Sequence, residues 1–231
     1  LFEKFSIDEV YAFHNLPGME VGSFATRSGT ITASESLFNI KLWGQGGHSA
    51  LPHMGVDTIT VGTQIITSLQ SIVSRKLNPA MNGVVSVTKF ESDGNENILP
   101  GHSIISGDAR ALSPEANKII EDSMRNIVEG IANAHGIKYE FTYDTRTNMT
   151  INTSEQASFA SKVAADLVGT DNVDGNCDPK LFSEDFAQML MVKPGCYILI
   201  GNGTKGIHGQ SLHSSTYDFN DKLLVIGSSF W

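Results

Sequence analysis

Apolar residues recur along most of the chain, with spacings that distinguish strands from helices. Residues 9–14 form a mainly apolar run that ends at the turn signal Asn15-Leu16-Pro17-Gly18, which predicts a buried strand. A second short apolar run, residues 196–200, is typical of a parallel strand that is buried on both faces. The other segments with a strand pattern are residues 36–43, 83–90, 103–112 and 137–143.

Two long helices are predicted between these strands. Apolar residues recur at helical spacing over 59–73, with Asp57 in the first turn, where a negative charge is favourable. The second helix begins at Ser113-Pro114, an N-cap followed by proline in the first helical position, and ends at Gly136. Shorter helices are expected after three residues that can act as caps: Ser154, Ser183 and Asp221.

The order of these elements predicts the architecture. Residues 36–144 contain strand, helix, strand, strand, helix, strand, which is the ferredoxin-like arrangement. Residues 1–35 and 145–231 then form parts of a second, discontinuous α/β domain that has few strands of its own. We therefore predict an incomplete α/β domain with an inserted ferredoxin-like α+β module, whose free sheet face can pack on a second subunit.

Composition and charge narrow the possible partners. The 231 residues carry a formal net charge of -9, which argues against a nucleic-acid partner. No apolar run has the length of a membrane span. The two cysteines, Cys177 and Cys196, are too few for a disulfide framework, and we expect both to be reduced in a cytoplasmic protein. The chain begins at Leu1, without an initiator Met, and reads like the middle of a longer protein.

Two histidines are candidate metal ligands. His14 ends the first predicted strand, and His213 lies in a loop after the apolar run 196–200. Neutral imidazole is the commonest metal ligand, and a strand end would give it a fixed direction. Taken singly, each is better explained as a structural or solvated histidine, because two histidines distant in sequence do not make a site.

Four further residues are candidates for catalysis or substrate binding, each with a structural alternative. His48, in Gly46-Gly47-His48-Ser49, is placed to donate to an oxyanion, or is an exposed turn residue. Arg110 can clamp a carboxylate, or form an internal ion pair. Asn97 belongs to a segment that reads as a turn, and Glu184 precedes Asp185 at a predicted helix start, where acids satisfy backbone N–H groups.

Taken together and in order, six segments resemble the M20 family of metallopeptidases, in particular its aminoacylase branch of hippurate hydrolases and auxin-conjugate amidohydrolases. The segments are Phe13-His14-Asn15-Leu16-Pro17-Gly18; Gly44 to His53; Asn97-Ile98-Leu99-Pro100 with Gly107-Asp108-Ala109-Arg110; Ser183-Glu184-Asp185-Phe186; Pro194-Gly195-Cys196-Tyr197 with Ile200 to Gly203; and Leu212-His213 with Tyr217 to Asp221.

The resemblance implies metal-dependent hydrolysis of the amide bond of N-acyl amino acids by two divalent ions (Zn, Mn or Co). His14 and His213 would each bind one ion, and Glu184 would lie close to them. The family's other metal ligands, a Cys-x-His stretch and a Glu-Glu pair, lie upstream and are not in this sequence. We therefore expect a chain that lacks an N-terminal portion, binds metal poorly and is inactive alone.

For the inserted module the resemblance implies a lid domain that forms a homodimer. His48 would reach the substrate, while Asn97 and Arg110 would hold the substrate carboxylate or the scissile carbonyl. Two alternatives remain open from the sequence: a non-catalytic dimerisation or binding module with a ferredoxin-like domain, and a dipeptidase of the same superfamily.

Overall fold

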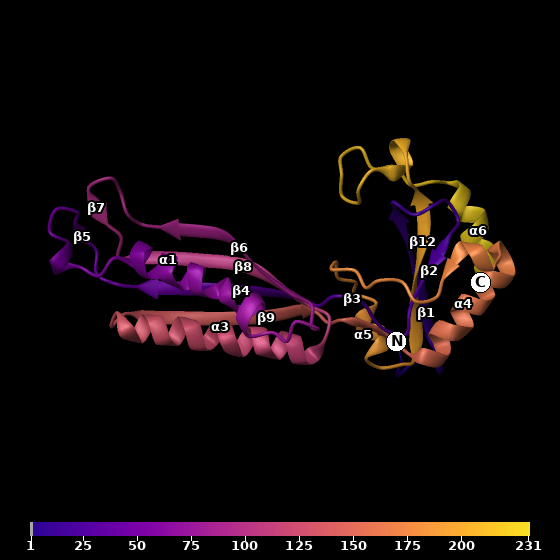
Figure 1. Ribbon diagram of the computed structural model, residues 1–231, viewed down its shortest axis with the longest axis horizontal. Coiled ribbons are helices and arrows are strands. Elements are labelled where there is room, and N and C mark those ends of the chain that lie inside the picture. The colour runs from indigo at the N-terminus through magenta and orange to yellow at the C-terminus, as the bar shows by residue number, and fades with distance from the viewer. Residues whose placement is uncertain (1) are drawn as a thin grey trace. The chain divides into compact units, whose positions relative to one another are not determined.

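A computed structural model describes residues 2–231, which divide into two compact units (Figure 1). The discontinuous unit comprises the residues up to Thr32 together with residues 150–180 and 184–231. The inserted unit comprises residues 33–149 and 181–183. Among the described residues, no helix combines the length and the apolar character that crossing a membrane requires.

The inserted unit is built on a four-stranded antiparallel sheet in the order β6-β8-β4-β9. Helix α1 connects β4 to β6 and helix α3 connects β8 to β9, which confirms the predicted ferredoxin-like order. The bounds are β4 (Glu35–Trp43), α1 (Thr58–Leu69), α2 (Ser71–Arg75), β6 (Gly83–Ser92), β8 (His102–Ala111), α3 (Pro114–Ala134) and β9 (Lys138–Thr147).

The helices of the inserted unit pack on one face of its sheet and form its core. Every second residue of β8 is buried, as expected for a strand with one covered face. Helix α3 begins at the expected cap, because the Ser113 side chain accepts from Ala116 N. Asp57, which was expected in the first turn of α1, is instead its N-cap, and its side chain accepts from Ile59 N. The helix predicted over 59–73 is interrupted at Gln70, so that α2 is a separate short helix.

A small two-stranded ribbon lies at one end of the inserted unit. It is formed by β5 (Gly47–His48) and β7 (Ile98–Leu99), with the short 3-10 helix η1 (Pro52–Met54) beside it (Figure 1). The loop glycines here allow close backbone approach. A Cβ on Gly46, for example, would lie 2.9 Å from the carbonyl oxygen of Leu99. The ribbon therefore brings two segments of the chain together that are about fifty residues apart in sequence.

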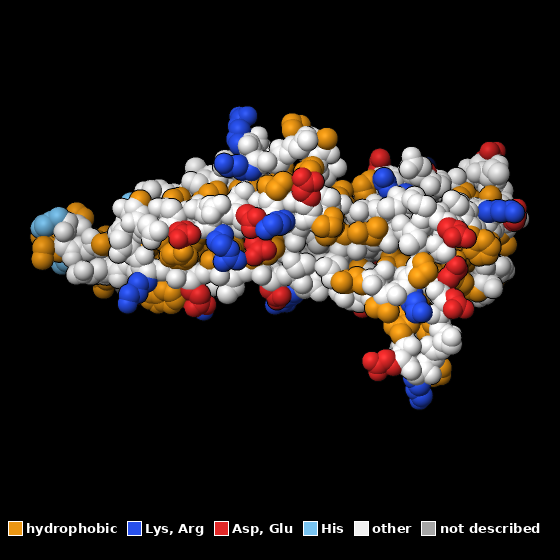
Figure 2. All heavy atoms as spheres, turned by 90° about the horizontal axis from the view of Figure 1, so that it is seen from below, with side chains coloured by type: hydrophobic (Ala, Val, Ile, Leu, Met, Phe, Trp, Pro, Cys, Tyr) orange, Lys and Arg blue, Asp and Glu red, His pale blue; other side chains and the backbone are white. Residues whose placement is uncertain are grey.

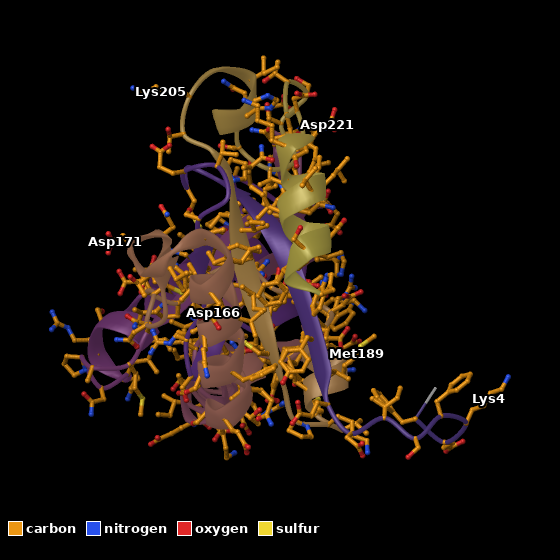
Figure 3. All side chains as sticks on the ribbon, turned by 90° about the vertical axis from the view of Figure 1, so that its right-hand side faces the viewer. Lys4, Asp166, Asp171, Met189, Lys205 and Asp221 are labelled. Atoms are coloured by element: carbon orange, nitrogen blue, oxygen red, sulfur yellow. The ribbon has the colours of Figure 1, made fainter. Side chains whose placement is uncertain are left out.

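The discontinuous unit contains a mixed sheet in the order β1-β12-β2-β11. All nine residues of β12 are buried, which confirms the prediction for residues 196–200, and β12 pairs in parallel with β1 and antiparallel with β2. Helices α4 and α6 lie along this sheet (Figure 3) and enclose a core that includes Phe24, Ile198, Ile200 and Leu223. The bounds are β1 (Val10–Pro17), β2 (Phe24–Ala25), β3 (Gly29–Thr32), β10 (Thr150–Asn152), α4 (Ser154–Val168), η2 (Thr170–Asn172), β11 (Val173–Asp174), α5 (Ala187–Leu190), β12 (Gly195–Gly203), η3 (Gly206–Gly209) and α6 (Lys222–Phe230).

Three local predictions in this unit were wrong. The first strand continues past His14 to Pro17, and its residues after Val10 are half-buried rather than buried. The residue that precedes α4 as its N-cap is Thr153, not Ser154. Ser183 caps no helix, because α5 begins only at Ala187.

Candidate active site

His14 lies within β1, opposite Leu199 of β12, and its ring is half-buried. Its Nδ1 lies 2.7 Å from the carbonyl oxygen of Asn15. A carbonyl only accepts, so Nδ1 carries the proton in the neutral ring and Nε2 keeps a free lone pair. This is the tautomer that a metal-binding histidine with a backbone-bonded ring nitrogen adopts. The ring also lines a pocket of about 320 Å³, together with Phe13, Phe219 and Trp231.

His213 lies in the loop between β12 and α6, as the sequence predicts, and its side chain is exposed. Its backbone φ is 63°, and it is the one non-glycine residue with a positive φ in the part of the chain that is described. Such a conformation is strained for a residue with a Cβ and persists only where the surrounding contacts enforce it. The contacts of the loop must therefore hold the backbone of His213 in this conformation.

A single hydrogen bond connects the two histidine-bearing segments. Asn15 Nδ2 donates to Tyr217 Oη at 2.6 Å, and Asn15 follows His14 directly while Tyr217 lies four residues after His213. Across residues 2–231, however, no three His, Cys, Asp or Glu side chains are grouped closely enough to hold a metal ion. The side chains present therefore do not by themselves make up a two-metal centre.

Glu184 is half-buried in the discontinuous unit, where a tyrosine already engages its carboxylate. Tyr197 Oη donates to Glu184 Oε2 at 2.6 Å, and the Phe186 amide lies 3.4 Å from Oε1. Burial of Tyr197, followed by its bond to Glu184, raises the pKa of the tyrosine far above its ordinary value, so the phenol stays protonated and donating. These contacts tie the segment before α5 to β12.

His48 and Asn97 are brought together by the ribbon of β5 and β7. His48 pairs with Ile98, and the Ser49 amide donates to the Asn97 carbonyl at 3.1 Å. His48 Nδ1 accepts from the Ala50 amide at 3.0 Å, which places the proton of the neutral ring on Nε2. Figure 2 shows histidine side chains exposed at the left end, where Figure 1 places β5 and β7. An exposed Nε2–H is a suitable donor to a substrate oxygen.

Arg110 is engaged within the inserted unit and lies far from this ribbon. Its Nε donates to Asp108 Oδ2 and its Nη2 to Glu35 Oε1, both at 2.8 Å, and its side chain is 19% exposed. The internal ion pair considered from the sequence is thus present. Arg110 lies eight positions from His102 on β8, which corresponds to about 27 Å along the strand. The inserted unit therefore does not bring Arg110 to His48 and Asn97.

Sequence reasoning assigned no role to Asn15 or Asn202. Asn202 is fully buried at the end of β12, and its Nδ2 donates to the carbonyl oxygens of His208 and Asp218, at 2.8 and 3.0 Å. The available signal was an amide side chain in an otherwise apolar strand, because such a group must find internal hydrogen bonds.

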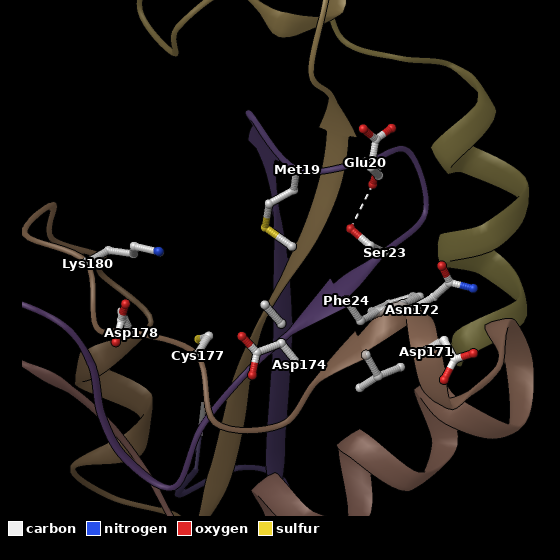
Figure 4. A pocket seen from close by; sticks show the side chains of 12 residues that line it. Met19, Glu20, Ser23, Phe24, Asp171, Asn172, Asp174, Cys177, Asp178 and Lys180 are labelled. Carbon is white, nitrogen blue, oxygen red and sulfur yellow. Dashed lines mark hydrogen bonds between the residues drawn. The ribbon is translucent and has the colours of Figure 1, made fainter.

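A second pocket, of about 430 Å³, lies beside β2 and β11 in the same unit (Figure 4). It contains none of the residues proposed from the sequence. Its charged lining residues are Glu20, Asp171, Asp174, Asp178 and Lys180. Figure 4 shows Ser23 bonded to the Glu20 backbone at its rim, at 2.8 Å.

Comparisons with known proteins agree with the six-segment resemblance. Residues 37–135 match the family model of the M20 peptidase dimerisation domain. Hippurate hydrolase of Campylobacter jejuni is 36% identical over all 231 residues, which cover 59% of its length. N-acetyldiaminopimelate deacetylase of Exiguobacterium sibiricum is 32% identical over 92% of this chain and 57% of its own length.

A solved structure shows the same fold. The dinuclear metal-binding M20 peptidase of Bacillus subtilis has a TM-score of 0.79 and 24% identity, over 97% of this chain and 55% of that one. The chain thus spans a little more than half the length of the relatives that it matches. The similarity of all 231 residues to part of a hippurate hydrolase, together with the shared fold, shows that the relatives of this chain are M20 amidohydrolases and that residues 37–135 are an M20 peptidase dimerisation domain.

Proposed function

We propose that this protein hydrolyses the amide bond of N-acyl amino acids. The observation that carries the proposal is the 36% identity to a hippurate hydrolase across every residue of the chain, including both histidine-bearing segments. A second relative is an N-acetyldiaminopimelate deacetylase, and its name also denotes removal of an acyl group from an amino-acid nitrogen. Comparison of N-benzoyl with N-acetyl amino acids as substrates will show which acyl group the protein prefers.

Each candidate residue has a proposed role that fits the atoms left free. His48 would donate from Nε2–H to the scissile carbonyl oxygen as negative charge develops there, and Asn97 beside it would orient the same group. Arg110 retains three N–H donors beyond those bound by Asp108 and Glu35, enough for an end-on fork toward a substrate carboxylate. Because Arg110 lies far along β8 from the ribbon, Arg110 and the His48–Asn97 pair would reach one substrate only from different subunits of a dimer.

His14 and His213 are proposed ligands of two divalent ions, Zn, Mn or Co, with Glu184 near them. A two-metal site requires several ligands close together, and the described residues contain no such group. The remaining ligands would therefore come from a segment outside this chain. The strand β1 supports this view, because it is apolar and pairs on one side only, with β12. We expect the 231 residues alone to bind metal weakly and to hydrolyse nothing measurable.

The test compares this chain with a protein extended to the length of its relatives. Each is assayed with N-benzoyl and N-acetyl amino acids in the presence of Zn, Mn or Co, and with unblocked dipeptides to detect a dipeptidase. We expect only the extended protein to act, and His213→Ala to abolish its activity. The control is His135→Ala, a histidine that bonds Gln64 in the inserted unit. Full activity of the His213→Ala protein would refute its assignment as a ligand.

We also propose that the inserted unit forms a homodimer, in line with its match to a dimerisation domain. Its sheet has two edges, β6 and β9. Strand β9 carries Lys138, Glu140, Asp144 and Arg146, charges that discourage further strand pairing, whereas Gly83–Val87 of β6 is uncharged. A second copy is therefore expected to pair along β6 in a symmetric, isologous contact.

Cysteine cross-linking tests this contact. Around a twofold axis, a residue near the axis meets its own copy, so Ser86→Cys or Thr88→Cys should give disulfide-linked dimers under mild oxidation. The native Cys177 and Cys196 are buried and should not interfere. Thr142→Cys on β9 is the matched control, and equal cross-linking there would exclude the β6 contact.

The second candidate function is a dimerisation or binding module without catalysis. It is favoured by one observation, that the described side chains do not group into a metal site. This alternative predicts dimers of the 231-residue chain together with an extended protein that remains inactive on every N-acyl amino acid.

A further inference from the structure

Asn15 contacts both histidine-bearing segments of the discontinuous unit. Its backbone carbonyl accepts from His14 Nδ1 at 2.7 Å, and its side-chain Nδ2 donates to Tyr217 Oη at 2.6 Å. Asn15 and Tyr217 are both half-buried, so neither end of the second bond is freely solvated. Two parts of the chain separated by 202 positions are thus held together through one amide group.

The loop that carries His213 is closed at its base by two asparagines, Asn202 and Asn220. Buried Asn202 donates to the carbonyls of His208 and Asp218, which draws the two arms of the loop together. Asn220 donates its amide N–H to Asn202 Oδ1 at 2.9 Å, and its Nδ2 to the Asn202 carbonyl at 3.0 Å. Lys205 and Asp221, labelled in Figure 3, mark the two ends of this loop. The base of the loop is therefore fixed to β12.

Above this base the loop is held mainly by bonds within itself, such as those of Thr216 to Gln210 at 3.4 Å and to Ser214 at 2.9 Å. His213 is exposed, so packing does not orient its ring, and its φ of 63° would relax in a free loop. The backbone bonds nearest to it, Ser214 N to Ser211 O at 3.2 Å and Tyr217 N to Ser214 O at 3.1 Å, are local turns. The bond from Tyr217 to Asn15 is the contact that ties this part of the loop to β1.

We propose that Asn15 is a positioning residue, which sets the tautomer of His14 through its carbonyl and the location of His213 through its bond to Tyr217. The inference rests on the proposed function for its catalytic meaning, since it presumes that both imidazoles serve the same reaction. The structural part of the proposal, that the Asn15 side chain holds the loop in place, does not depend on catalysis. Without the amide of Asn15, the loop opens more often and His213 leaves its left-handed conformation.

Four single variants of this chain and one double variant, Asn15→Leu with Tyr217→Phe, test the proposal. Tyr217→Phe and Asn15→Leu each remove the bond with little change in shape. Asn15→Asp restores it, because the tyrosine hydroxyl then donates to the carboxylate. The control is Tyr11→Phe, which removes a tyrosine hydroxyl that bonds Glu9 in the same unit.

Amide hydrogen exchange and the NMR signal of the His213 ring are the two readouts. We expect the amides of Ser214 and Tyr217 to exchange about fivefold faster in Tyr217→Phe and Asn15→Leu, the factor that corresponds to one net hydrogen bond. The His213 Cε1–H signal should shift in the same two variants and return in Asn15→Asp. The double variant should add nothing to either single one, because both remove the same contact.

Equal exchange in Tyr217→Phe and in the Tyr11→Phe control would overturn the proposal, as would additive effects in the double variant. In the extended protein, the same two variants should lower kcat more than they raise KM. If the extended wild type is inactive on N-acyl amino acids while the exchange results hold, the proposed function fails and the positioning of the loop by Asn15 stands.

Discussion

Replacing Gly107 by alanine should destabilise the inserted unit strongly. Gly107 lies in the middle of β8, between β4 and β6. A Cβ added there would lie 2.0 Å from the Ser86 carbonyl oxygen and 2.4 Å from Phe38 Cζ. The first neighbour is backbone within the β6–β8 ladder, and the second is a buried core ring, so neither can move without disturbing its own contacts.

The expected loss follows from overpacking. Inserting a methyl group into a packed interior lowers the free energy of unfolding by about 1–3 kcal/mol, and the backbone clash places Gly107→Ala near about 3 kcal/mol. Gly130→Ala is the matched control. Gly130 is exposed on α3, and a Cβ there meets nothing within 4 Å. Alanine should stabilise that helix by about 0.5–1 kcal/mol, because it has less backbone entropy to lose.

Urea unfolding followed by tryptophan fluorescence measures both effects. The chain has two tryptophans, and a Trp231→Phe background leaves Trp43 of β4 as the reporter of the inserted unit. We expect Gly107→Ala to lower the urea midpoint by about 1–2 M at an unchanged m-value, and Gly130→Ala to raise it slightly. A Gly107→Ala midpoint equal to that of the background protein would refute the argument that this strand requires glycine.

Three further predictions concern polar groups that have contacts inside the protein. Burial raises the pKa of Cys196 to about 11 from 9.0, so its thiol should resist alkylation at pH 8 until the chain unfolds. Because the thiol ionises at lower pH in the unfolded chain, the free energy of unfolding should fall as pH rises from 9 towards 11, which urea titrations would measure. Asn202→Leu should lower the free energy of unfolding by about 3 kcal/mol in urea titrations, because the backbone groups that it serves lose their partners. Arg110→Lys should lower it by about 1–2 kcal/mol in the same assay, because an ammonium cannot span Asp108 and Glu35 as a guanidinium does.

The inserted unit follows from its sequence because each element there has one covered face. Residues of β8 alternate between buried and half-buried, and those of β9 between exposed and half-buried, so the period of two is visible in the residue types. Helix α3 has a proline in its first turn and a serine cap, both local signals. Because the local pattern agrees with the burial of these elements, the strand order can be predicted from the ferredoxin-like order of the elements alone.

The errors fall where long-range contacts decide. Thr153 precedes α4 because its hydroxyl also binds the backbone of Gly195, 42 positions away, an attraction that Ser154 lacks. The first strand extends past His14 because β12 offers pairing partners as far as Gly203, which outweighs the turn signal of Pro17-Gly18. Neither contact leaves a trace in the residues nearby, so local propensity alone could not find them.

For the candidate site, sequence motifs name residue types, whereas chemistry depends on which atoms stay free. His14 and His48 illustrate the difference, since backbone contacts leave a lone pair on Nε2 of the first ring and a proton on Nε2 of the second. Asn15 and Tyr217 join segments 202 positions apart, and no pattern in either segment predicts the bond. If the two proposed ligands depend on that amide, then the residue beside a motif histidine is as much a part of the site as the histidine itself.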